Sequence, residues 1–133
     1  MAPMIVEVVG AVIRDATGKL LTVRKRGTTR FMLPGGKRDR DEDDLSALAR
    51  ELAEELGVRM VSAEWLGSFE APAANEPGAI VRSRAYRVEI AGTISCRAEI
   101  EALSWVDPSV TPDRPMAPLL LQHILPTLSG DDR

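Results

Sequence analysis

The chain has 133 residues, of which 44% are hydrophobic and 28% charged, and its formal net charge is −3. This length predicts one compact domain over residues 1–133, and the slightly acidic balance argues against a protein dedicated to binding DNA or RNA polymers. Because Cys96 is the sole cysteine and no apolar run approaches the roughly 20 residues that span a bilayer, we expect a soluble, cytoplasmic protein with no membrane partner.

The first elements are predicted to be strands. Residues 4–15 are rich in Val and Ile, which favours a buried strand, and residues 20–25 follow a turn as the second half of a hairpin. Residues 26–43 then form a polar, glycine-bearing loop. Its length suggests a functional role, because long ordered loops in small domains are often functional.

A helical pattern extends from Asp43 to Leu56. Its apolar stripe recurs at three- and four-residue spacing and consists of Leu45, Leu48, Ala49, Leu52 and Leu56. Acidic residues at its start suit the positive end of the helix dipole, and Gly57 is a typical C-terminal stop. This segment is therefore the most strongly predicted helix of the chain.

The second half of the chain alternates strands with loops. Apolar and alternating runs predict one strand or two at 58–71, a half-exposed strand at 79–90 and a short strand at 103–107. Residues 115–128 predict a C-terminal helix that Pro126 should end or distort. Trp65 and Trp105 are expected in the core. This order of elements predicts an α/β fold, with a mixed sheet covered by helices.

Three glutamates, Glu51, Glu54 and Glu55, fall within an arc of about 100° near the end of the first helix. Like charges so placed destabilise a helix by roughly 0.2–0.5 kcal/mol per pair and crowd the negative end of its dipole. A solvated acidic face is the simplest explanation. The adjoining apolar stripe and the preceding glycine loop instead favour a site for a hard cation such as Mg²⁺, although the spacing alone names no reaction.

Residues 36–58 read GKRDRDEDDLSALARELAEELGV. This string resembles the Nudix box: Gly, five residues, Glu, seven residues, then Arg-Glu-aliphatic-x-Glu-Glu-x-Gly-aliphatic. All nine specified positions fit, namely Gly36, Glu42, Arg50, Glu51, Leu52, Glu54, Glu55, Gly57 and Val58. The preceding LPGG is also typical of the family. The resemblance implies a Nudix α/β/α sandwich, with a mixed β-sheet between helices.

The resemblance also implies an activity. Nudix hydrolases cleave the diphosphate linkage of a nucleoside diphosphate linked to another group X, usually with Mg²⁺ or Mn²⁺. By this resemblance the metal ligands would be Glu51, Glu54, Glu55 and the backbone carbonyl of Gly35. Arg50 would orient the carboxylates through salt bridges, and Glu42 would support the loop or an outer metal.

Two carboxylates are candidates for the general base that accepts a proton from water. Glu54 is the first, because Glu51 and Glu55 lie closer together and are expected to be the more committed ligands. In some family members the base or a further ligand comes from outside the box, a role for which Glu99, or failing that Glu101, is suitably placed. An exposed glutamate at a strand end is the alternative interpretation of Glu99.

Four residues outside the box are candidates for substrate binding. Arg30 could bind phosphates, Phe31 could stack on a base, and Arg82 and Arg84 could form a phosphate-and-base surface on one strand face. Core packing of Phe31 and simple solvation of the arginines are the alternatives.

The substrate is less clearly marked. Pro72 falls close to, but not at, the position where some ADP-ribose hydrolases of the family carry a proline, and the tyrosine expected in dinucleoside-polyphosphate hydrolases is absent nearby. The leading interpretation is a MutT-type pyrophosphohydrolase of nucleoside triphosphates or modified nucleotides. The alternatives are an ADP-ribose or nucleotide-sugar pyrophosphatase and a non-catalytic Nudix-fold ligand-binding module. Dimers are common in the family, so a homodimer is an open alternative to a monomer.

Overall fold

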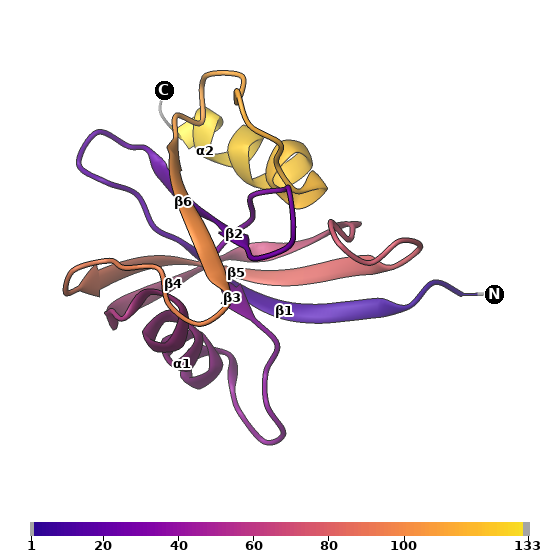
Figure 1. The fold of residues 1–133 in the computed structure, drawn as a ribbon, viewed down its shortest axis with the longest axis horizontal. Helices are drawn as coiled ribbons and strands as arrows, with labels where there is room; N and C mark the ends of the chain where they lie inside the picture. Colours follow the sequence, from indigo (N-terminus) through magenta and orange to yellow (C-terminus); the bar gives the residue numbers. More distant parts are fainter. Residues whose placement is uncertain (1, 132–133) are drawn as a thin grey trace.

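A computed structural model describes residues 2–131. Two β-sheets lie at its centre (Figure 1). The larger, mixed sheet has four strands, in the spatial order β3 (Gly35–Gly36), β1 (Ile5–Val12), β5 (Ile80–Ala91) and β4 (Arg59–Pro72). The smaller sheet pairs β2 (Leu20–Lys25) with β6 (Ile100–Val106). Strands β1 and β5 are parallel, whereas every other pair in the two sheets is antiparallel.

Helices flank the sheets on opposite sides. Helix α1 (Asp44–Leu56) lies on one side, and a π-helical segment η1 (Leu120–Ile124) continuous with α2 (Leu125–Asp131) lies on the other (Figure 1). Successive side chains of β1 alternate between two buried clusters, so that Val9 and Ala11 join the α1 side and Val12 the η1 side. The expected α/β sandwich is confirmed.

Helix α1 begins and ends as the sequence predicts. The Asp43 side chain caps it by accepting a bond from the Ser46 amide, and Gly57 ends it in the left-handed region at φ 68°. Its predicted stripe is mostly confirmed, since Leu48, Leu52 and Leu56 are fully buried. Leu45, in the first turn, is exposed instead. Burial of this stripe leaves Glu51 and Glu55 against the glycines at the edge of the sheet.

The expected hairpin of β1 and β2 is only partly formed. Only the residues next to the turn are paired as in a hairpin: Arg14 and Leu20 form a β-bridge, and the Leu21 amide donates to the Ile13 carbonyl. The rest of β2 pairs with β6 and not with β1. Strand β2 is buried on both faces, with Leu20 in one core cluster and Leu21 in the other, so it packs between the two layers instead of extending the larger sheet.

The segment predicted at 58–71 is one strand, β4 (Arg59–Pro72), which contains two register shifts. Trp65 on β4 lies edge-on to Tyr86 of the neighbouring strand and remains exposed. Trp105 on β6 is exposed as well, so the prediction that both tryptophans are in the core was wrong. Strand β6 also extends further toward the N-terminus than the predicted segment 103–107.

Pro126 distorts the C-terminal helix without ending it. The Leu125 amide bonds to the Leu120 carbonyl, five residues back, which is the wider spacing of a π-helix. A proline ring clashes with a regular α-helical turn before it, and the widened turn relieves that clash. The helix therefore continues to Asp131. Within residues 2–131, no helix has both the length and the apolar character needed to cross a membrane.

Candidate functional site

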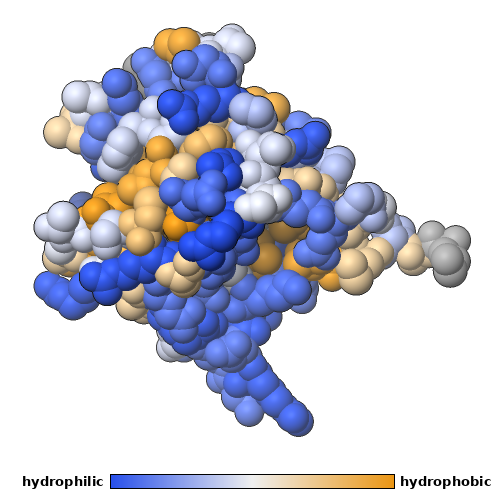
Figure 2. All heavy atoms as spheres, in the orientation of Figure 1, coloured by the Kyte–Doolittle hydropathy of each residue, from blue (hydrophilic) through white to orange (hydrophobic). Residues whose placement is uncertain are grey.

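The acidic end of α1 lies against β3, the two-glycine edge strand of the larger sheet. The loop that joins β3 to α1 projects from the body of the protein as a hydrophilic protrusion (Figures 1 and 2). At the base of this protrusion the α1 glutamates meet the glycine backbone. The site is therefore built where a helix C-terminal half contacts a sheet edge.

Glu55 is the most deeply buried of the three glutamates, with 1% of its surface exposed. Its Oε1 accepts a hydrogen bond of 3.0 Å from the Gly35 amide. Burial raises the pKa of this carboxyl to about 8, and the negative charge of Glu51 acts in the same direction. A carboxylate held in this way strongly favours any partner that brings positive charge.

Glu51 lies directly against Gly36. A Cβ added at Gly36 would stand 2.7 Å from the Glu51 carboxyl carbon, so a side chain on this glycine would displace the carboxylate. Burial raises the pKa of Glu51, although Arg50 opposes that shift. The glycines of β3 thus leave room for two acidic side chains at the sheet edge.

Arg50 connects the acidic residues around it. Its guanidinium donates to both carboxylate oxygens of Glu42, at 2.8 Å each, and to Glu51 at 3.0 Å. It also reaches Glu54 at 3.5 Å and the Lys37 carbonyl at 3.2 Å. The Arg50 hydrogen bonds hold the pKa of Glu42 at about 2. This forked pairing fixes the loop before α1 to the helix.

A pocket of about 360 Å³ opens beside β3. Its charged end is lined by Lys25, Lys37, Glu51 and Glu99. The Lys25 Nζ stands 3.8 Å from the Glu99 Oε1, and the charge of Glu99 acts on both Glu51 and Glu55. The rest of the wall is largely apolar and includes Val6, Val8, Leu33, Val81 and Leu119. The pocket therefore suits a ligand with one charged and one apolar part.

The structure places Glu99 in the wall of this pocket, and it does not place Glu101 there. Glu101 instead pairs with Arg24 at 2.8 Å. Arg30 is exposed and does not line the pocket. Phe31 is 4% exposed and belongs to a core cluster, so its ring is unavailable to a base and the packing alternative is correct.

Arg82 and Arg84 are corrected by strand geometry. Successive side chains of β5 point to opposite faces, and Val81 and Ser83 are the ones that line the pocket. Arg82 pairs with exposed acids on the other face, with Glu70 at 2.7 Å, and Arg84 bonds to Asp44 at the start of α1. Both arginines therefore face away from the pocket and secure neighbouring elements.

The donor set fits a divalent cation in part. Glu51 and Glu55 are withdrawn from water and burial raises the pKa of both, so a cation bound between them would displace a proton and favour their ionised forms. Across residues 2–131, however, no three His, Cys, Asp or Glu side chains converge closely enough to hold one ion as they stand. Glu54 is 54% exposed and turned toward Arg50.

The NUDIX domain model matches residues 4–127. The chain belongs to the Nudix family. It is 32% identical over 126 residues to a MutT-like protein of Streptomyces ambofaciens, with 94% of this chain and 77% of the relative covered. It is also 32% identical over 118 residues to a CTP pyrophosphohydrolase of Escherichia coli, with coverages of 85% and 84%.

Solved structures agree on the fold of this Nudix protein. The crystal structure of a MutT protein from Methanosarcina mazei superposes with a TM-score of 0.80 at 21% identity, covering 100% of this chain and 99% of that one. Family membership and the relatives make the protein a Nudix pyrophosphohydrolase. Nudix hydrolases act on nucleotide small molecules and generally use divalent metals.

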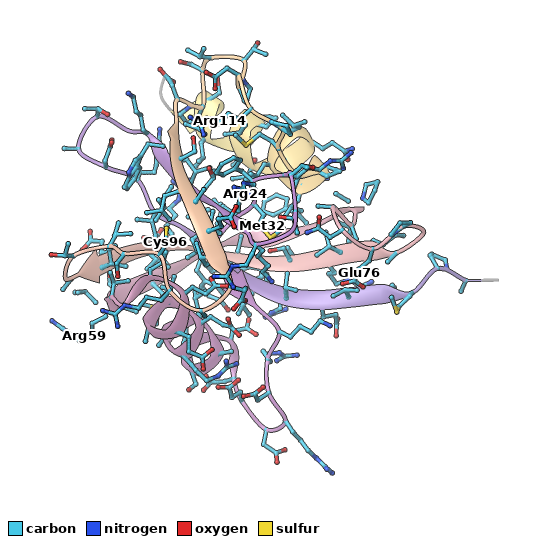
Figure 3. The ribbon with its side chains drawn as sticks, in the orientation of Figure 1. Arg24, Met32, Arg59, Glu76, Cys96 and Arg114 are labelled. Carbon is cyan, nitrogen blue, oxygen red and sulfur yellow. The ribbon has the colours of Figure 1, made fainter. Side chains whose placement is uncertain are left out.

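Sequence reasoning missed two parts of the Nudix pocket. Ser83 is buried in its wall, and the loop after β4 contributes Asn75 and Glu76. Figure 3 labels Glu76 on this loop. A partial signal for Ser83 was present, because strand alternation places it on the face opposite Arg82 and Arg84, although alternation alone does not mark which face bears the pocket. A polar residue at such an inward position is unusual enough to mark a site. The loop residues carried no comparable pattern.

Proposed function

We propose that this Nudix protein hydrolyses a diphosphate bond of a nucleoside triphosphate or modified nucleotide, with Mg²⁺ or Mn²⁺ as cofactor. The observation that carries the proposal is the nearly complete burial of the Glu55 carboxylate beside Glu51, at the charged end of a pocket that is otherwise largely apolar. Ionising the buried Glu55 beside Glu51 costs stability unless further positive charge joins the pair. A divalent cation and the phosphates it neutralises supply that charge.

The proposed ligands are Glu51, Glu54, Glu55 and the Gly35 carbonyl. The hydrogen bond from the Gly35 amide to Glu55 supports the set, because it keeps this glycine backbone in contact with the acidic cluster. A cation bound there would activate water and stabilise the charge on the leaving phosphate. Arg50 keeps Glu42 and Glu51 in fixed positions and is the proposed orienting residue.

The proposed general base is Glu54 or Glu99. Glu54 is exposed and weakly held by Arg50, so it can accept a proton and release it to solvent. Glu99 lines the pocket itself, where a proton taken from water would reach it directly. In either case water attacks phosphorus, the bridging P–O bond breaks, and the base takes the proton lost by the water.

The division of the pocket supports a nucleotide over a simple polyphosphate. Lys25 and Lys37 offer positive charge for phosphates at one end, and the apolar wall accommodates a base or another apolar group. The Escherichia coli relative is named a CTP pyrophosphohydrolase, so CTP is the first substrate to test. ADP-ribose and nucleotide sugars are the alternative substrates.

A substrate panel tests the proposal. The full chain is incubated with Mg²⁺ or Mn²⁺ and, in turn, the four ribonucleoside triphosphates, their deoxy forms, oxidised nucleotides, ADP-ribose and a nucleotide sugar. Pyrophosphate and phosphate release are measured. We expect metal-dependent release of pyrophosphate from at least one nucleoside triphosphate and its loss in Glu55→Gln. If ADP-ribose were the only compound hydrolysed, the substrate class would be ADP-ribose and not nucleoside triphosphates. Nucleotide binding without any hydrolysis would indicate a ligand-binding module.

A further inference from the structure

The Ser83 hydroxyl is a buried polar group without a partner. The residue is 1% exposed, and no hydrogen bond reaches its Oγ within the described part of the chain. A buried hydroxyl left unpaired costs roughly 1–3 kcal/mol, so buried polar groups in proteins are nearly always paired. Ser83 lines the pocket, which makes a bound ligand the natural source of the missing partner.

The surroundings of Ser83 are apolar. Val8 is its neighbour across the parallel pair of β1 and β5, and Val81 precedes it on the same face. Leu33 lies close to the hydroxyl, because both side chains approach Gly10. A Cβ built on Gly10 would stand 3.1 Å from the Leu33 Cδ1 and 3.2 Å from the Ser83 Oγ. The absence of a side chain at Gly10 therefore lets Leu33 and the hydroxyl pack closely over β1, and a ligand would reach the hydroxyl through a shift of Leu33 or a change of the Ser83 rotamer.

Ser83 also lies at a useful distance from the acidic cluster. Strand β5 is two strands away from β3, which at about 4.8 Å per strand places Ser83 roughly 10 Å from Gly36. Glu51 lies against Gly36, so the charged part of a nucleotide belongs there. The part of the ligand that reaches Ser83 is then remote from the phosphates and lies between aliphatic side chains, as a flat, uncharged base would.

We propose that Ser83 hydrogen-bonds the base of the bound nucleotide and is a specificity-determining residue of this enzyme. The inference rests on the proposed function and deepens it, because it assigns the base to the apolar wall formed by Val8, Leu33 and Val81. A hydroxyl both donates and accepts, and a base edge offers at least one matching group. The site that pairs with a base edge in this way discriminates against bases that leave the hydroxyl unpaired.

The test compares Ser83→Ala and Ser83→Thr with the wild-type chain. Kinetics with Mg²⁺ are measured on CTP, UTP, ATP, GTP and the corresponding deoxynucleotides. We expect Ser83→Ala to raise KM for the preferred base about tenfold with kcat nearly unchanged, while KM for the other bases changes little. Ser83→Thr keeps the hydroxyl and should restore the preference. Without nucleotide, Ser83→Ala should unfold at the same temperature as the wild type or higher, because it removes an unpaired buried group.

Thr22→Val is the matched control. Thr22 is also fully buried, but its hydroxyl donates to the Ser104 carbonyl at 2.7 Å. This variant should lower the unfolding temperature and leave the base preference unchanged. Ser83→Ala should instead keep or raise the unfolding temperature and change the base preference. A lower unfolding temperature with an unchanged preference would show that Ser83 has only a structural role.

Three results would overturn the inference. Equal KM changes for every base would assign Ser83 to the phosphates or to packing, and a change only in the ratio of ribo- to deoxynucleotides would assign it to the sugar. An unchanged KM for all substrates would remove Ser83 from the site. If the wild-type chain hydrolyses no nucleotide, the proposed function fails while the Ser83 contact can still be tested. Calorimetric titration of CTP, UTP, ATP and GTP into the wild-type and Ser83→Ala chains then measures whether the substitution weakens binding of one base more than the others.

Discussion

Replacing Glu55 by glutamine should stabilise the metal-free protein and inactivate the enzyme. Glu55 is buried at the sheet edge, where burial and the charge of Glu51 raise its pKa from the ordinary 4.5 to about 8. Glutamine has nearly the same shape and keeps an oxygen for the Gly35 amide, but it cannot ionise. The substitution therefore isolates the cost of the buried charge.

The sign of the effect follows from proton binding. Between pH 4.5 and about 8 the folded protein keeps a proton on Glu55 that the unfolded chain has already released, so stability falls as the pH rises through this range. At about 1.4 kcal/mol per pKa unit, the wild type loses about 4 kcal/mol by pH 8. The Glu55→Gln variant escapes this loss. The two proteins should be similarly stable near pH 4.5, and the variant should be about 4 kcal/mol more stable at pH 8.

Urea unfolding in EDTA at pH 5 and pH 8 measures this difference. Glu54→Gln is the control, because it removes a neighbouring carboxylate of the same cluster that is more than half exposed and therefore carries no comparable cost of burial. Addition of Mg²⁺ should stabilise the wild type but not Glu55→Gln, whose turnover should be lower by orders of magnitude. A Glu55→Gln variant no more stable than the wild type at pH 8 would refute the reasoning.

Three further predictions concern the same site. Glu54→Gln should lower kcat by about 10²–10⁴-fold if Glu54 is the base, with an unchanged urea midpoint, and near-wild-type kcat would exclude that role. Gly35→Ala should destabilise the fold by about 3 kcal/mol in urea unfolding, because its Cβ would stand 2.0 Å from the Val9 carbonyl oxygen at φ 143°; a wild-type midpoint would contradict this. Arg50→Lys should raise the Glu42 pKa from about 2 toward its ordinary value, since lysine cannot pair with both carboxylate oxygens. NMR titration of the carboxyl groups measures this pKa, and an unchanged value for Glu42 would contradict the prediction.

The sequence predicts α1 and its acidic cluster well because the relevant signals are local. Three- and four-residue spacing determines which leucines are buried, and Asp43 and Gly57 set the ends of the helix. The box motif likewise lies within one continuous segment. Arg50 follows from the same segment, and the structure shows it joined to Glu42 and Glu51 as that pattern implies.

The substrate side of the pocket depends on contacts between distant segments. Whether Arg82 faces the pocket or its opposite side depends on the register of β5 against β1, which strand alternation alone leaves undetermined. The same is true of β2, whose departure to β6 reflects burial on both of its faces. Phe31 is buried because residues 115–117 lie beside it, bonded through the Phe31 and Ala117 backbones. These pairings join segments that are far apart in the sequence, so a local pattern of apolar and polar residues does not predict them.

The contact between the Gly35 amide and Glu55 gives this protein a built-in reporter. One backbone N–H touches the carboxylate whose ionisation is predicted to accompany cofactor uptake. Its NMR chemical shift and its rate of deuterium exchange should therefore register both the departure of the proton and the arrival of magnesium, without any label. A titration followed at that single resonance would show whether the two events are simultaneous or successive.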